Sequence, residues 1–142
     1  MIKQNIVFVE NKAGSLNKVT KMLKENDVFI YGFACFDAPE FALFRMVADN
    51  AEKAEKVLTE NGYMNRINNV IAIDFSDEVG GLDALLEVFA ESNINIDYVY
   101  TSFHRTSQIP VVILQSEELT VSESILRKKG YRIIDNANDF LK

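Results

Sequence analysis

A six-residue pattern occurs twice in this chain and constrains its fold more than any other feature. The two copies are Asn11-Lys12-Ala13-Gly14-Ser15-Leu16 and Asp77-Glu78-Val79-Gly80-Gly81-Leu82. Each copy follows an apolar, β-rich run and precedes a stretch with helical spacing, and the offset from Gly14 to Gly80 is 66 residues. The pattern therefore predicts one structural unit written twice, with a strand-to-helix turn at the same place in each copy.

The segments between the turns follow the same order in both halves. In the first half, apolar and β-branched runs at residues 6–9, 28–36, 41–47 and 63–67 predict strands. Gly14 precedes a first helix, and either Asp49 or Asn50 caps a second. In the second half, strands are expected at residues 70–75, 94–103 and 111–114, with helices after Gly81 and after a capping box from Thr120 to Glu123. The tail from residue 135 is polar and carries no assignment.

This order predicts an α+β fold made of two ferredoxin-like βαββαβ units, with antiparallel sheets and helices on one face. We place the domain boundary between residues 68 and 69, which gives a first unit of 1–68 and a second of 69–142. Units of about seventy residues bury little surface alone. We therefore expect the two units to pack side by side, and the chain to form a homodimer or another homo-oligomer.

The composition excludes several classes of partner and cofactor. The net charge is -6, which opposes binding to nucleic acid or to an anionic membrane surface. Cys35 is the only cysteine and His104 the only histidine, so no disulfide, metal site or other cofactor is expected. Because no apolar run has the length of a membrane span and the first nine residues lack a signal sequence, we expect a cytoplasmic protein.

Within this order, the turns and the strand after each first helix resemble the ACT domain, a small regulatory module that binds amino acids. The family pattern is an Asp or Asn, two residues, Gly, one residue and Leu, followed past the helix by Asn-Ile. The first copy has Asn11, Gly14 and Leu16, with Ala13 where Pro is common and Phe29-Ile30 in place of Asn-Ile. The second copy has Asp77, Gly80 and Leu82, with Val79 in place of Pro, and it keeps Asn95-Ile96.

The resemblance implies two ligand sites at the junction of the modules, each built from one module's turn and the other's second strand. The first site comprises Asn11, Ala13, Gly14, Ser15 and Leu16 with Asn95 and Ile96. The opposite site comprises Asp77, Val79, Gly80, Gly81 and Leu82 with Phe29 and Ile30, and it lacks the strand Asn. The first site therefore ranks above the second, although Asp77 could hold a ligand's ammonium group by charge.

The chemistry of a free amino acid agrees with this assignment. Its carboxylate needs N–H donors and its ammonium needs oxygen acceptors, and helix-start amides and Asn supply both. The same residues also have structural explanations, because tight turns need glycine, Asn and Asp commonly cap helices, and Asn95 could be an outward polar residue. The sequence does not distinguish among side chains of the ligand.

Three functions remain open at this point. The first is a non-catalytic amino-acid sensor that signals to a partner enzyme or pathway of amino-acid metabolism. The second is a small enzyme on the same scaffold, for which Cys35 and His104 are poor candidates: Cys35 is expected to be buried in a strand, and His104 to be a solvated turn residue. The third is an interaction module in which the glycines are only turns.

Overall fold

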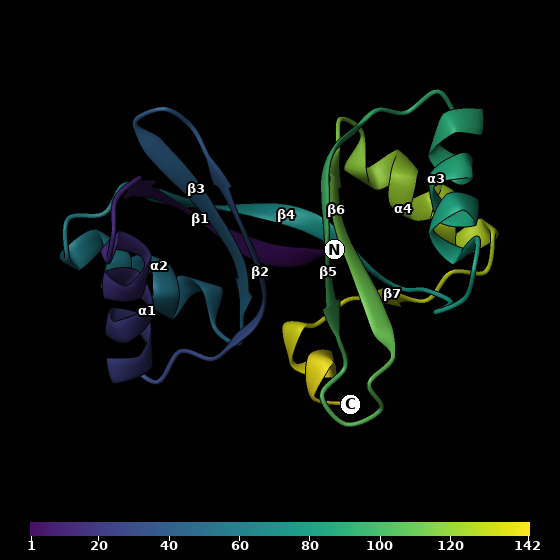
Figure 1. Cartoon of the computed structure of the whole chain (residues 1–142). Helices are drawn as coiled ribbons and strands as arrows, with labels where there is room; N and C mark the ends of the chain where they lie inside the picture. Colours follow the sequence, from purple (N-terminus) through teal and green to yellow (C-terminus); the bar gives the residue numbers. More distant parts are fainter. The chain divides into compact units, whose positions relative to one another are not determined.

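The computed structural model describes residues 1–142 and divides into two compact units (Figure 1). The first unit is Lys3–Asn68, and the second is Asn69–Lys142 together with Met1 and Ile2. Each unit combines two α-helices with a β-sheet (Figure 1). None of the helices is both long and apolar enough to span a lipid bilayer.

The first unit arranges its strands in the order β2-β3-β1-β4. The pairs β1–β3 and β2–β3 are antiparallel, with Val7 opposite Phe44 and Phe36 opposite Leu43. The elements in chain order are β1 (Ile2–Glu10), α1 (Ser15–Glu25), β2 (Ile30–Asp37), β3 (Phe41–Ala48), α2 (Ala51–Glu60) and β4 (Asn65–Asp74).

The second unit repeats this arrangement in the order β5-β6-β4-β7. The pairs β4–β6, β5–β6 and β4–β7 are antiparallel, and Ile96 lies opposite Ser116. After the second half of β4, its elements are α3 (Gly81–Glu91), β5 (Ile96–Phe103), β6 (Pro110–Ser116), α4 (Leu119–Lys128), β7 (Ile133–Ile134) and the short 3-10 helix η1 (Ala137–Leu141). The expectation of two ferredoxin-like βαββαβ units is confirmed.

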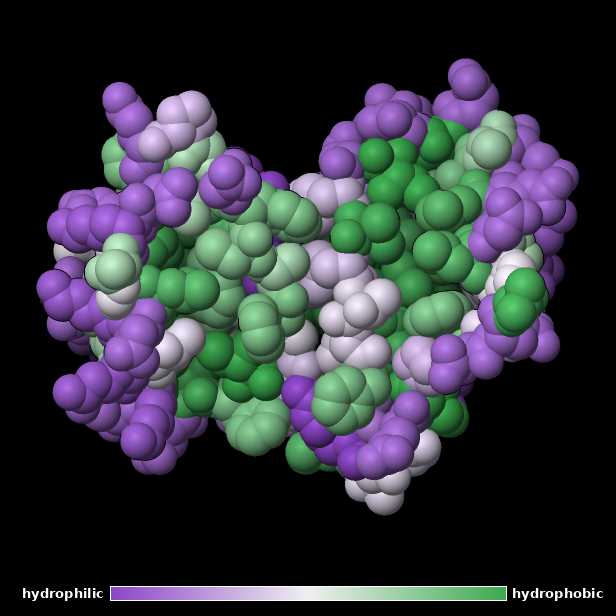
Figure 2. Space-filling view, viewed as in Figure 1, coloured by the Kyte–Doolittle hydropathy of each residue, from purple (hydrophilic) through white to green (hydrophobic).

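Each unit has its own hydrophobic core between the helices and one face of the sheet. In the first unit, Val19 and Leu23 of α1 and Leu58 of α2 pack with Val7 and Phe44 of the sheet. In the second unit, the corresponding core contains Leu85, Phe89, Leu126, Ile73 and Val112. Within the first unit, the surface view shows mostly hydrophilic side chains over α1 and α2 and hydrophobic ones over the strands (Figure 2).

The region around residue 68 differs from the sequence-based expectation. We expected two strands, at residues 63–67 and 70–75, but the structure has one strand, β4, from Asn65 to Asp74. Asn68 and Asn69 favour turns, and this tendency suggested a break. The strand continues because the Asn68 side chain accepts a hydrogen bond from Gln4 Nε2 at 2.9 Å, and Gln4 is fully buried.

The helix starts agree with the sequence in one case and differ in another. Of the two residues expected to cap α2, Asp49 and Asn50, it is Asn50 that does so, since its side chain accepts a hydrogen bond from the Lys53 amide at 3.0 Å. The prediction of a capping box from Thr120 to Glu123 is wrong, because α4 begins at Leu119 and no side chain caps it. Glu123 instead accepts a hydrogen bond from the N-terminal ammonium of Met1 at 2.9 Å, which ties the start of the chain to the second unit.

His104 is buried, so the expectation of a solvated turn residue is wrong. It is 2% exposed, and its ring lies 6.0 Å from that of Phe140, measured between centroids. His104 Nδ1 donates to the Asp139 carbonyl oxygen at 3.0 Å, while Nε2 lies 2.6 Å from Asp74 Oδ1. The C-terminal tail, which had no assignment, is therefore held against the β5–β6 hairpin, where the Thr106 hydroxyl also donates to the Leu141 carbonyl.

Replacing His104 by Ala is expected to lower the free energy of unfolding by about 2 to 3 kcal/mol, because the largely buried Asp74 carboxylate loses its hydrogen bond to the ring, while Arg132 Nε stays 3.6 Å from Asp74 Oδ2. Urea denaturation measures this change, and faster amide exchange at residues 139–142 would show release of the tail. The exposed Lys128→Ala variant is the control and should stay within about 0.5 kcal/mol of the parent. Equal effects of the two substitutions would contradict this role for His104.

Candidate ligand-binding site

The first corner joins β1 to α1 and contains five of the predicted site residues. Gly14 has φ +83°, a left-handed conformation that favours glycine, and no side chain caps the first amides of α1. The Ser15 amide donates to the Lys12 carbonyl at 3.2 Å. Asn11 is tied to the β2–β3 hairpin, because its backbone amide donates to Glu40 and its Nδ2 to Ala38, both at 3.4 Å.

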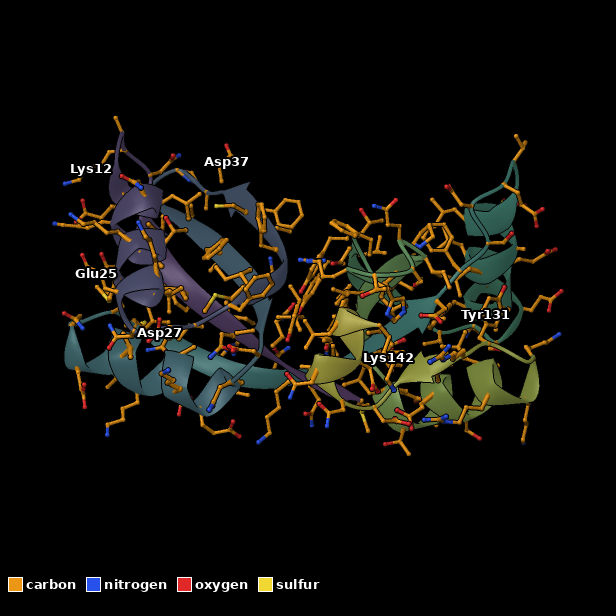
Figure 3. All side chains as sticks on the ribbon, turned by 90° about the horizontal axis from the view of Figure 1, so that it is seen from below. Lys12, Glu25, Asp27, Asp37, Tyr131 and Lys142 are labelled. Carbon is orange, nitrogen blue, oxygen red and sulfur yellow. The ribbon has the colours of Figure 1, made fainter.

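Two lysines give this corner a positive charge. Lys12 Nζ lies 2.6 Å from Glu10 Oε2, and this contact lowers the pKa of Glu10 and raises the pKa of Lys12. Lys18 forms no ion pair within 4.0 Å, although its charge also lowers the pKa of Glu10. A cavity of about 350 Å³ lies between the corner and the turn that follows α2, and its lining includes Lys12, Ser15, Lys18 and Tyr63. Lys12 points outward at the beginning of α1 (Figure 3).

The second corner joins β4 to α3 and has the same backbone geometry with a different charge. Gly80 has φ +87°, and the Gly81 amide donates to the Glu78 carbonyl at 3.0 Å. Asp77 and Val79 are exposed, and Leu82 is 46% exposed. This corner therefore presents an acidic side chain where the first corner presents Asn11.

Gly81 has a structural role of its own. A Cβ atom added there would lie 2.2 Å from the Ser76 carbonyl oxygen, a separation that no packed side chain adopts. At Gly14 an added Cβ would meet nothing within 4 Å. Close packing of the backbone thus accounts for Gly81, whereas only the left-handed φ accounts for Gly14.

The strand residues of the two predicted sites differ in what they bond. Phe29 is half exposed, and its backbone exchanges hydrogen bonds with Asp49: the Phe29 amide donates to Asp49 Oδ1 at 3.0 Å, and the Asp49 amide donates to the Phe29 carbonyl at 2.9 Å. The neighbouring Ile30 begins β2 and packs against the first core.

In the second unit, Asn95 precedes β5 and is exposed, while Ile96 packs against the second core. The Asn95 amide donates to Glu117 Oε1 at 3.3 Å, and its Nδ2 donates to Asp97 Oδ1 at 3.2 Å.

Two adjoining cavities of about 320 and 500 Å³ are both lined by Asn95. Glu117 lines the smaller one, and sequence reasoning missed it because no motif marks it. Only the β5–β6 register, with Ile96 opposite Ser116, brings residue 117 beside residue 95.

The structure thus groups the predicted residues within each unit. Asn11, Ala13, Gly14, Ser15 and Leu16 form one corner of the first unit, which also holds Phe29 and Ile30. The residues from Asp77 to Leu82 form the matching corner of the second unit, which also holds Asn95 and Ile96.

Cys35 is exposed, so the expectation of a buried thiol is wrong. It lies on β2 near Asp37, which points away from the first unit at the end of the strand (Figure 3). Partial burial and then the negative charge of Asp37 raise the pKa of the thiol. A raised pKa leaves less thiolate at neutral pH, which argues against a nucleophilic role.

Comparison of two glycine variants tests the account of the corners. Gly14→Ala is expected to cost about 1 to 2 kcal/mol through its left-handed backbone alone. Gly81→Ala is expected to cost more, because its Cβ meets a backbone oxygen that side-chain rotation cannot move. Urea-induced unfolding of both variants decides the point. A smaller loss for Gly81→Ala than for Gly14→Ala would contradict the close approach to Ser76.

Comparison with known proteins adds to this geometry. The family model for the ACT domain pair matches residues 1–140. No curated protein sequence matches the chain. Among solved structures, a protein from Bacteroides thetaiotaomicron is similar, with a TM-score of 0.89 and 23% identity over 99% of this chain and 96% of that one.

Two further solved structures share the fold. The regulatory subunit of aspartate kinase from Thermus thermophilus, in its ligand-free form, has a TM-score of 0.62 and 14% identity, over 89% of this chain and 90% of that one. The same subunit from Thermus flavus has a TM-score of 0.57 and 16% identity, over 90% and 92% of the two chains.

Proposed function

The chain belongs to the ACT domain pair family, and from this premise we propose that it is a non-catalytic regulatory protein that binds a free amino acid. In this proposal, ligand binding changes the conformation of the chain, and a partner enzyme of amino-acid metabolism responds to that change. The observation that carries the proposal is that the family match extends across both repeats, each with its own glycine corner.

The chemistry of the described residues supports a zwitterionic ligand. At the first corner, the uncapped amides of α1 and the ammonium group of Lys18, which forms no ion pair within 4.0 Å, suit a carboxylate. In the second unit, Asn95 and Glu117 offer oxygen acceptors that suit an ammonium group. The chain therefore contains groups for both charged ends of a free amino acid.

A regulatory role is also consistent with the structural neighbours. Two of them are regulatory subunits of aspartate kinase, each covering about nine-tenths of this chain. Their identity to this chain is low, so the fold is what they share. Under our proposal, the chain has a regulatory role of the same general kind, with a partner that its own sequence does not name.

The enzymatic alternative receives little support from the two residues best suited to it. Both ring nitrogens of His104 are engaged, one with the Asp139 carbonyl and one with Asp74, and the ring is buried. The Cys35 thiol has a raised pKa. Neither group is placed for general acid–base or nucleophilic catalysis, which requires an accessible and activated atom.

Isothermal titration with each of the twenty amino acids tests the proposal, and at least one should bind at millimolar concentration or below. Asn95→Ala should weaken that binding about tenfold, the loss of roughly one hydrogen bond to a charged group. Gly14→Leu should weaken it as well, and circular dichroism checks that this variant is folded. The exposed Asn17→Ala variant is the control and should bind as the parent does.

Absence of binding by all twenty amino acids would contradict the sensor and favour the interaction module, in which the glycines serve only as turns. If the parent chain turns over a substrate and the Asp77→Ala or His104→Ala variant loses that activity, the result would instead support the enzymatic alternative.

A further inference from the structure

We propose that Glu117 and Asn95 hold the ammonium group of the ligand, and that the side chain of the ligand is apolar and lies in the groove between α3 and β5. This inference rests on the proposed function and makes it more specific. It assigns a role to a carboxylate that the family pattern does not include, and it narrows the ligand to a class of amino acids.

Glu117 follows β6 and lies beside the start of β5. The antiparallel register, in which Ile96 is opposite Ser116, brings Glu117 next to Asn95. Glu117 Oε1 accepts the Asn95 backbone amide at 3.3 Å, and the carboxylate forms no ion pair within 4.0 Å. Both residues line the cavity of about 320 Å³, together with Asn93 and the C-terminal end of α3. This cavity therefore contains a carboxylate that has no cationic side chain within 4.0 Å.

The neighbouring Asp97 determines which atom Asn95 presents. An ionised carboxylate only accepts hydrogen bonds, so the Asn95 side chain turns its Nδ2 toward Asp97 Oδ1, at 3.2 Å. One of the two N–H donors of the carboxamide is thereby used, and its Oδ1 remains as an acceptor. Glu117 and Asn95 together offer oxygen acceptors and the negative charge of Glu117, against one remaining N–H of Asn95, an arrangement that favours an ammonium group over a carboxylate. Asp97 is a positioning residue in this scheme.

A mostly apolar groove, whose lining also includes Asp97, adjoins this cavity. Its volume is about 500 Å³, and it shares Phe89, Ala90, Ile94 and Asn95 with the smaller cavity. Leu86 of α3 and Val99 of β5 line its further part. An amino acid whose ammonium group lies at Glu117 can extend its side chain along this groove. Aliphatic, thioether or aromatic side chains would remove apolar surface from water there, whereas charged ones would lose solvation.

The first repeat shows what part of this arrangement is purely structural. At the corresponding place, Asp49 accepts the Phe29 amide at 3.0 Å, so a carboxylate fixes the start of the second strand in both repeats. A test must therefore separate the negative charge of Glu117 from its hydrogen bond to the backbone. Glu117→Gln does so, because the Gln carbonyl oxygen can still accept the Asn95 amide.

The experiment is isothermal titration of the full chain with valine, leucine, isoleucine, methionine and phenylalanine in turn, and with their N-acetyl derivatives. We expect at least one free amino acid of this group to bind and its N-acetyl form, which has no ammonium group, to bind at least tenfold more weakly. Glu117→Gln should lower the affinity for the free amino acid at least tenfold. Glu118→Gln, a change of the adjacent carboxylate outside both cavities, should leave it unchanged.

The outcomes separate this inference from the proposed function. Unchanged affinity in Glu117→Gln, or equal binding of the N-acetyl form, would overturn the ammonium site while leaving an amino-acid sensor in place. Binding restricted to aspartate, glutamate, lysine or arginine would overturn the apolar class. If none of the twenty amino acids binds the parent chain, the inference and the proposed function both fail.

Discussion

The left-handed glycines at the starts of α1 and α3 are the constraint on which the rest of this structure depends. At each corner the chain must leave a strand and turn onto the helical layer, and Gly14 and Gly80 allow this with φ values of +83° and +87°. Neither glycine carries a side chain that could cap the helix, so no side chain bonds the amides of the first turn, although the first amide of each helix donates to a backbone carbonyl of the preceding turn. The geometry that makes the fold possible thus also creates two places suited to negatively charged groups.

The two repeats use this shared geometry differently. The first corner carries Lys12 and Lys18, while the second carries Asp77 and Glu78. The strand partner differs too, since Phe29 stands in the first repeat where Asn95 stands in the second. The two repeats therefore share a backbone conformation but differ in the charge and polarity of their side chains. This difference supports the expectation of two unequal ligand sites. The C-terminal tail adds a further difference, because His104 and Phe140 anchor it to the second unit alone.

The fold could be predicted from the sequence because its signals were local and occurred twice. A turn repeated at an offset of 66 residues, with the same order of apolar runs, determines the βαββαβ pattern of each unit. The errors arose where distant contacts override local preference. Asn68 stays in a strand because its side chain accepts a hydrogen bond from Gln4. Glu123 bonds the N-terminal ammonium group and does not take part in a capping box. His104 is buried because the C-terminal tail packs against it. Glu117 could not be found by any motif, since only strand register places it beside Asn95.

A crystal structure of the chain with its tightest-binding amino acid tests the central claim most directly. Our account predicts density for one zwitterion whose amino nitrogen lies within hydrogen-bond distance of Asn95 Oδ1 and the Glu117 carboxylate. Density for the amino acid at a place that touches neither Asn95 nor either glycine corner would contradict it. A structure in which the protein's own side chains fill both corners would contradict it as well.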